Sequence, residues 1–234
     1  MFRFFRKIRS KFYEQGDIRK YLLYALGEIF FIVIGILIAL QINNWNERKQ
    51  ETQLSDEMVS EIKTGIESDL KELNSFINTH QEVMRSQVII SKWLSSKTDF
   101  SDSLSINLSR AYMAKDYEIN YSAYETLKSF GLKSIKSKAK RRAVSNLYEF
   151  KYPEFQKFST IYQKFLDDLL AGNSKHFNEI NYMQATMRPL NPQNLKGDSE
   201  YIYRFNTLKN FSYLLIFQGT TLKKEMEKTL KEIG

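Results

Sequence analysis

An uninterrupted apolar run at residues 29–40 constrains this chain more than any other feature. The run carries no polar side chain, so a helix formed here has no face suited to water while another face packs on a core. Extended to residues 21–42, the segment holds only Glu28 and Gln41 as strongly polar residues. A helix of this length spans about 33 Å at roughly 1.5 Å per residue, which is enough to cross a bilayer.

Three interpretations of this segment are a buried core helix, a cleaved signal peptide and a retained membrane anchor. A core helix at the surface of a domain needs a polar face, which the run lacks. Cleavage requires small residues in an A-x-A pattern, and here Ala39 is paired with Gln41. We therefore favour a signal-anchor helix over residues 21–45, with Tyr21 and Tyr24 at one interface and Trp45 at the other.

The charge distribution predicts the orientation of that anchor. The chain has a net charge of +8, and its first twenty residues hold seven Lys or Arg against two acids. On the other side, Arg48 and Lys49 are offset by Glu47 and Glu51. The positive-inside rule places the N-terminus in the cytoplasm and residues 46–234 outside, which in a bacterial inner membrane means the periplasm.

The N-terminal segment 1–20 interleaves phenylalanines with basic residues. This pattern is typical of a short amphipathic helix that binds the anionic cytoplasmic leaflet of the membrane lipid. A disordered basic tail that only sets the topology is the open alternative.

Four stretches carry a resemblance to a known family: "FFRKIR" (4–9), "YLLYALGEI" (21–29), "VIGILIALQINNWNE" (33–47) and, more weakly, "YETLKSFGLKSIKSKAKRRAVSNLYEF" (124–150). Together they resemble an uncharacterised family of bacterial single-span membrane proteins, a domain of unknown function. The resemblance implies membrane attachment and no particular activity.

Residues 46–234 are expected to form an all-α periplasmic domain, an elongated antiparallel helical bundle continuous with the anchor helix. Apolar residues at spacings of three, four and seven predict a long helix to about residue 95, and a Ser/Asp-rich break follows at 95–103. Two short helices are expected within 104–130 and a basic helix after Gly131. The last helix begins after the 187–199 loop, capped by Asp198 or Ser199.

An aromatic heptad lies between these helices, with Pro153 expected to bend or restart its helix. The spacing favours core packing over the lining of a ligand pocket. Its members are Tyr148, Phe155, Tyr162 and Leu169, with Tyr152, Phe158 and Phe165 between them.

Catalytic and cofactor motifs are sparse. The chain has no cysteine, and its two histidines, His80 and His176, have no second ligand at a metal-binding spacing. We find no nucleophile elbow and no phosphate-binding glycine loop. The carboxylates of residues 61–72 fit a solvated helix face. We therefore expect no enzymatic activity, no cofactor and no metal site.

A basic patch follows Gly131. It packs six basic residues into ten positions, and no acid occurs between Glu125 and Glu149. A solvated helix face is the simplest interpretation, with an acidic partner, anionic lipid or polysaccharide as alternatives; nucleic acid is not expected outside the inner membrane. The patch comprises Lys133, Lys136, Lys138, Lys140, Arg141 and Arg142.

Glu28 is the single residue with the sharpest implication. An ionisable group inside a bilayer costs roughly 2.5 kcal/mol or more and marks a functional site by default. If the span begins one residue later, Glu28 instead lies at the cytoplasmic interface. Gly27, Gly35 and Ala39 form a small-residue stripe on which two helices can approach closely, so we expect a homo-oligomer or a subunit of a larger membrane complex.

Two functional hypotheses follow. The first is a non-enzymatic, membrane-anchored protein whose outer domain mediates protein–protein interaction or assembly. The second is a ligand-sensing or stator-like, transport-accessory subunit that uses Glu28 in the membrane. The 20-residue tail is too short for an output domain, which favours the first.

Overall fold

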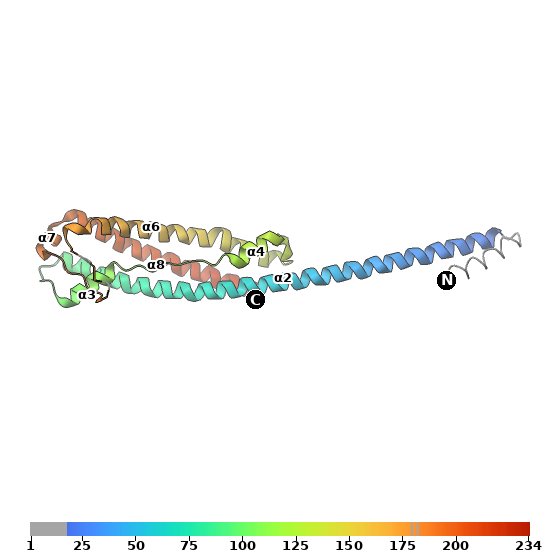
Figure 1. Ribbon diagram of the computed structural model, residues 1–234, viewed down its shortest axis with the longest axis horizontal. Coiled ribbons are helices and arrows are strands. Elements are labelled where there is room, and N and C mark those ends of the chain that lie inside the picture. The colour runs from blue at the N-terminus through green and yellow to red at the C-terminus, as the bar shows by residue number, and fades with distance from the viewer. Residues whose placement is uncertain (1–17, 179, 182) are drawn as a thin grey trace. The chain divides into compact units, whose positions relative to one another are not determined.

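The computed structural model describes residues 18–178, 180–181 and 183–234 (Figure 1). Within them the chain is all-α, as the sequence predicts; the only β-type pairing among these residues is an isolated bridge between Asn181 and Thr186. Most of the predicted segment 1–20 lies outside the described residues. The chain divides into two compact units, Met1–Leu54 and Ser55–Gly234.

Seven α-helices and three short helical turns make up the described chain, in the order shown in Figure 1. The α-helices are α2 (Ile18–Leu94), α3 (Asp102–Ala111), α4 (Ser122–Phe130), α5 (Lys138–Asn146), α6 (Tyr152–Ala171), α7 (Pro192–Gly197) and α8 (Ser199–Ile233). The turns are η1 (Leu132–Ser134), the π-helical η2 (Leu147–Lys151) and η3 (Asn173–Lys175).

Local sequence explains where several helices begin and end. The side chain of Ser101 accepts a hydrogen bond from Leu104 N and caps α3, and Asp198 caps α8 in the same way through Tyr201 N. Pro153 is the second residue of α6. The chain before it is helical without a break, first as α5 and then as the π-helical η2, so the proline follows a change of helix type and no gap in the helix.

Within the second unit, α8 runs antiparallel to α2. The Ser91 hydroxyl donates to Asn206 Oδ1 at 2.7 Å, and the Ser212 hydroxyl donates to Gln87 Oε1 at 2.7 Å. Lower residue numbers on α2 thus pair with higher residue numbers on α8, which is the pattern of antiparallel helices. Gly219 continues the contact, because a Cβ added there would lie 3.2 Å from an Ile77 side-chain carbon.

Helix α6, in contrast, runs parallel to α2. The Tyr152 hydroxyl donates to Asp69 Oδ2 at 3.1 Å. Two turns further along α2 and one turn further along α6, the rings of Phe76 and Phe155 meet at 5.5 Å. Because α2 and α6 run in the same direction, the chain must run back along the unit after α2 ends and before α6 begins. The return is made by the extended segment 113–121, which runs along the unit from α3 to α4 (Figure 1).

The aromatic heptad forms the core of this unit, as its spacing predicts. The side chains of Tyr148, Phe155, Tyr162 and Leu169 are each 1–2% exposed. Phe158 and Phe165 are only half-buried; their rings pack on Phe211 at 6.4 Å and 5.2 Å. The heptad positions are therefore core, while the intervening phenylalanines lie at its margin.

Truncation to alanine should cost more stability at the buried heptad positions than at the half-buried phenylalanines. Tyr162→Ala removes a buried ring and is expected to destabilise the protein by about 3–5 kcal/mol. Phe158→Ala removes a half-buried ring and should cost clearly less. Denaturant unfolding of the full chain in mild detergent, followed by circular dichroism, measures both; equal losses would show that the burial difference has no energetic consequence.

Candidate functional site

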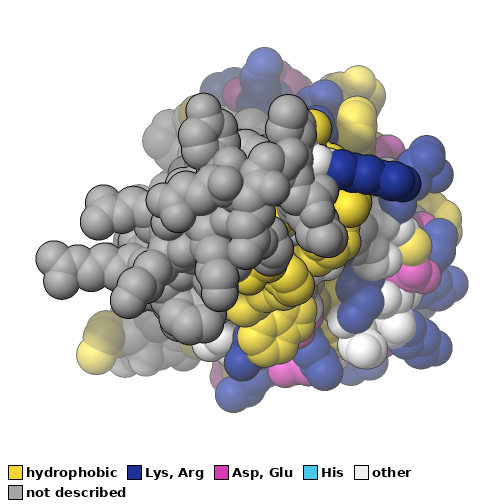
Figure 2. Space-filling model, turned by 90° about the vertical axis from the view of Figure 1, so that its right-hand side faces the viewer, with side chains coloured by type: hydrophobic (Ala, Val, Ile, Leu, Met, Phe, Trp, Pro, Cys, Tyr) yellow, Lys and Arg dark blue, Asp and Glu magenta, His cyan; other side chains and the backbone are white. Residues whose placement is uncertain are grey.

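The apolar segment of α2 is uncovered along its length. An 18-residue window has a mean hydropathy of 2.5 and no buried residue, so by length and composition the helix can cross a membrane; a signal sequence shares this composition. Figure 2 shows hydrophobic side chains open to view at the surface. Trp45 is 62% exposed, and Lys49 Nζ lies 5.8 Å from the centre of its ring.

The predicted assembly residues all lie on this segment. Gly27 and Glu28 are partly exposed, and Gly35 and Ala39 are exposed. A Cβ added at Gly27 or Gly35 would meet no described atom within 4 Å, so both glycines offer space for a second helix. Assembly itself stays a prediction.

The basic patch is divided in two by its hydrogen bonds. Lys140 Nζ donates to Ile233 O at 2.8 Å and so caps the C-terminus of α8, where a cation also favours the helix dipole. Arg141 donates to Ile135 O at 3.1 Å. These two side chains serve the fold. The remaining members of the patch are exposed: Lys133, Lys136, Lys138 and Arg142.

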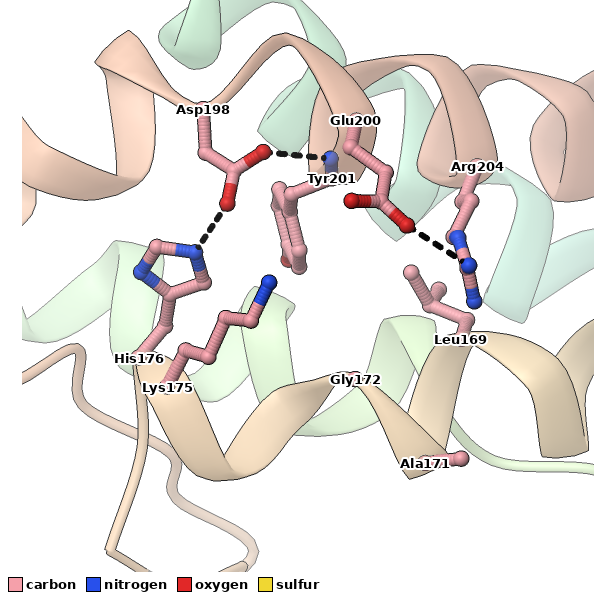
Figure 3. Close-up of a pocket in the computed structure, with 9 residues that line it drawn as sticks. All are labelled: Leu169, Ala171, Gly172, Lys175, His176, Asp198, Glu200, Tyr201 and Arg204. Atoms are coloured by element: carbon pink, nitrogen blue, oxygen red, sulfur yellow. Dashed lines mark hydrogen bonds and ion pairs between the residues drawn. The ribbon is translucent and has the colours of Figure 1, made fainter.

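A charged pocket lies where α6 ends and α8 begins, with a cavity volume of about 270 Å³ (Figure 3). Asp198, Glu200, Tyr201 and Arg204 line it from the start of α8, and His176 lies opposite. Lys175, Leu169, Ala171 and Gly172 complete the lining.

Asp198 holds this end of the unit together through both carboxylate oxygens. One oxygen accepts from Tyr201 N at 2.9 Å, and the other is 2.8 Å from His176 Nε2. The Tyr201 N–H and the His176 ring together lower the pKa of the Asp198 carboxyl. The sequence predicted the cap at Asp198, but the pairing with His176 spans 22 residues and has no local signature.

The remaining pocket charges are unevenly paired. Arg204 donates to Glu200 Oε1 at 2.7 Å and to Asp168 O at 2.9 Å. Figure 3 shows the Lys175 side chain extending between His176 and Glu200. Such an arrangement can receive a small charged molecule. Among the described residues, no three His, Asp or Glu side chains gather as metal ligands.

One buried titratable group on α2 corrects the sequence interpretation. Asp69 belongs to the carboxylates read as a solvated face, but it is 4% exposed, whereas Glu61, Glu67 and Glu72 are exposed as expected. Asp69 falls between Ile66 and Leu73 on the apolar stripe, and that register was the signal for burial. Burial raises the pKa of Asp69.

His80, on the same stripe, is 1% exposed, and burial lowers its pKa. Its Nε2 lies 3.0 Å from Lys115 O. A carbonyl only accepts, so Nε2 carries the proton and Nδ1 is the bare nitrogen, which has no partner among the described residues. The ring packs between Phe76 and Tyr162, at 4.3 Å and 5.0 Å.

Tyrosines enclose Asp69. Besides the Tyr152 hydrogen bond, Asp69 Oδ1 accepts from Asn120 N at 3.3 Å. Tyr148 packs edge-on against Tyr152 at 5.0 Å and stacks on Tyr124 at 4.5 Å. Burial raises the pKa of Tyr152 and Tyr148, so these hydroxyls stay protonated beside the carboxyl.

The chain is thus an all-α protein that joins one uncovered apolar helical segment to a packed helical unit. It belongs to the DUF6090 family, a family of unknown function whose model matches residues 28–208. This confirms the resemblance to an uncharacterised domain, although the match does not reach the stretch at 4–9. No curated protein and no solved structure shows a significant match to the chain.

Replacement of His80 should remove a pH-dependent part of the stability. Since burial lowers the folded pKa of His80, its contribution is present above the unfolded value of about 6.5 and is lost as the pH falls towards the folded pKa. His80→Gln retains a donor for Lys115 O and should flatten the change in melting temperature between pH 8 and pH 5. An unchanged slope would contradict a buried neutral imidazole.

Replacement of Asp69 should change the pH dependence of stability in the opposite direction. Its raised folded pKa means that the native state holds the proton more tightly, so stability falls as the pH rises from about 3.9 through the folded pKa. Asp69→Asn keeps the Oδ1 acceptor for Asn120 N and places Nδ2, a donor, against the Tyr152 hydroxyl, which can accept; it should stabilise the protein at pH 7, with less effect near pH 4. Glu67→Gln, on the exposed face, is the matched control; a similar gain there would refute the assignment.

Proposed function

We propose that this protein is a non-enzymatic membrane-anchored protein of the bacterial inner membrane, whose periplasmic helical domain mediates protein–protein interaction or assembly. The observation that carries the proposal is the contrast between the two units. The second unit buries its own aromatic core, whereas the apolar segment of the first has no cover in the described chain. Exposed apolar surface on this scale is stable only in a lipid or protein environment.

Exposed apolar side chains on the second unit support the interaction role. Tyr203, Leu214 and Phe217 lie on the outer face of α8, and Ile161 lies on α6. Tyr203 and Phe217 are 72% and 65% exposed and are four turns apart on one face. Large exposed aromatics are enriched at protein interfaces, which is why we assign the partner to this domain.

The charged pocket of Figure 3 supports a second candidate function, ligand sensing or a transport-accessory, stator-like role. In this alternative a small charged ligand binds beside Lys175 and Arg204, and Glu28 acts within the membrane. Thermal-shift measurements with small carboxylates and amines, on wild type and Lys175→Ala, distinguish the alternatives. A shift lost in the variant favours sensing.

Topology and retention of the anchor are tested together. A reporter that is active only outside the inner membrane, fused after Gly234, should be active because basic residues are concentrated before the apolar segment. Mass spectrometry of the purified protein should find an N-terminus near Met1. An active cytoplasmic reporter at Gly234 would reverse the orientation, and a mature start between residues 38 and 46 would identify a cleaved signal peptide.

Assembly is tested by single cysteines, which the cysteine-free chain makes unambiguous. Residues 27, 31, 35 and 39 recur once per helical turn, so crosslinking through them in membranes should exceed crosslinking at 29, 33 and 37. Glu28→Gln, which keeps the shape and removes the charge, should permit insertion and alter the crosslinked yield. Uniformly low yields with an unchanged Glu28→Gln variant would show that the segment does not self-associate.

A further inference from the structure

One end of the second unit brings together a basic loop, the C-terminus of α8 and the first turns of this unit's part of α2. Lys140, on α5, caps the last turn of α8 through Ile233 O. A Cβ added at Gly234 would lie 3.8 Å from Lys63 Nζ, so α8 ends beside the first turns of this unit's part of α2. A shallow groove lined by Ser60, Thr64 and Thr126, among others, places α4 beside the same turns.

The loop at this end exposes cations together with an aromatic ring. Phe130 is 58% exposed and ends α4, and Gly131, at φ +88°, turns the chain away from that helix. Lys133, Lys138 and Arg142 are exposed, and no hydrogen bond or ion pair joins their side chains to the described residues. With Lys136, these residues form what we call the α4–α5 basic surface: Phe130, Lys133, Lys136, Lys138 and Arg142.

Chain connectivity limits how far the start of the second unit can lie from the apolar segment. Ser55, the first residue of the second unit, follows Trp45 by ten positions. That is about 15 Å along a helix and at most about 36 Å fully extended. If the apolar segment lies in a bilayer, this limit keeps the start of the second unit close to the membrane. A basic surface on the same end of that unit then attracts anionic headgroups once the two come within a Debye length, roughly 8–10 Å.

We propose that the α4–α5 basic surface binds the anionic phospholipid surface next to the anchor, with Phe130 at the headgroup level and the Lys and Arg side chains on lipid phosphates. This rests on the proposed membrane anchoring. Each basic side chain near an anionic lipid surface adds to the attraction, and an apolar ring such as Phe130 can enter the boundary between headgroups and acyl chains. Acidic residues of the same end lie on α2 and α8, such as Asp56 and Glu232. Glu125, on α4, pairs with Lys128 at 2.7 Å, and residues 126–148 contain no acid.

The division within the basic patch supports this assignment. Lys140 and Arg141 donate to backbone carbonyl oxygens and satisfy the fold. Their neighbours Lys138 and Arg142 are exposed on the same short helix, so their charges are available to an outside partner. A headgroup layer fits this surface because its phosphates lie in a plane and require no shaped pocket.

The test uses the full chain in lipid nanodiscs, with an environment-sensitive dye on Ser129→Cys, the only cysteine. Discs of phosphatidylcholine alone are compared with discs containing phosphatidylglycerol, and quenching by headgroup spin-labelled lipid reports contact. We expect quenching and a blue shift only in the anionic discs, both lost in 1 M salt, where the Debye length is about 3 Å. Co-elution of protein and disc reports the anchor independently.

Charge reversal supplies the matched comparison. Each basic residue near an anionic surface strengthens binding roughly fivefold, so reversal of Lys133, Lys138 and Arg142 to Glu should weaken the contact about hundredfold or more. The control reverses Lys92, Lys97 and Lys164, three exposed lysines outside this surface, and should leave the contact intact. Phe130→Ser should reduce the blue shift and leave part of the salt-sensitive contact.

The outcomes separate this proposal from the anchor. Protein that co-elutes with discs but shows no quenching, or equal quenching in neutral and anionic discs, overturns the lipid-binding surface and leaves the anchor standing. A dye response only to a soluble anionic polysaccharide assigns the surface to that polymer and also overturns the proposal. Protein that fails to enter discs of either kind overturns the anchor, and the lipid-binding surface with it.

Discussion

The second unit depends on how its extended segment, residues 113–121, satisfies a backbone that has no helical hydrogen bonds of its own. Buried backbone polar groups are almost always paired, so the neighbouring helix must supply partners. Helix α2 does so twice: His80 donates to Lys115 O, and Asp69 accepts from Asn120 N. Both residues are nearly inaccessible to water, which makes a polar group on the apolar stripe a structural requirement.

This connection determines the order of the helices. The last helix, α8, lies antiparallel to α2. Helix α6 lies parallel, because residues 113–121 carry the chain back along the unit before α4 and α5 reverse it again (Figure 1). Tyr152 can then donate to the same carboxylate that holds Asn120 N. Asp69 thus joins α2, α6 and the connection between them.

Periodicity in the sequence was sufficient to predict the parts of this fold that depend on one element at a time. The seven-residue spacing from Tyr148 to Leu169 identifies one buried face, and Asp198 marks the start of α8. The parallel course of α6 could not be predicted, since a helix pattern is the same in either direction. The position of Asp69 between Ile66 and Leu73 on the apolar stripe favours burial, but a lone acid is usually solvated, so its charge led us to predict exposure.

The same limit applies to the candidate sites. A helix that is apolar on all sides suits either the centre of a large core or a membrane, and the structure decides against a core by leaving this one uncovered by the described chain. The charged pocket depends on residues far apart in sequence: the pairing of His176 with Asp198 needs η3 and the start of α8 to meet. Composition could not divide the basic patch either, since Lys140 and Lys138 are chemically identical.

The difference between those two lysines shows what the fold adds to a charge pattern. Lys140 reaches the end of α8, where unpaired carbonyl oxygens and the helix dipole attract a cation, and its charge is used within the domain. Lys138, one half-turn earlier on α5, is exposed to solvent. A run of like charges is therefore sorted by helix geometry into a structural part and an outward part, and only the outward part is available to a partner.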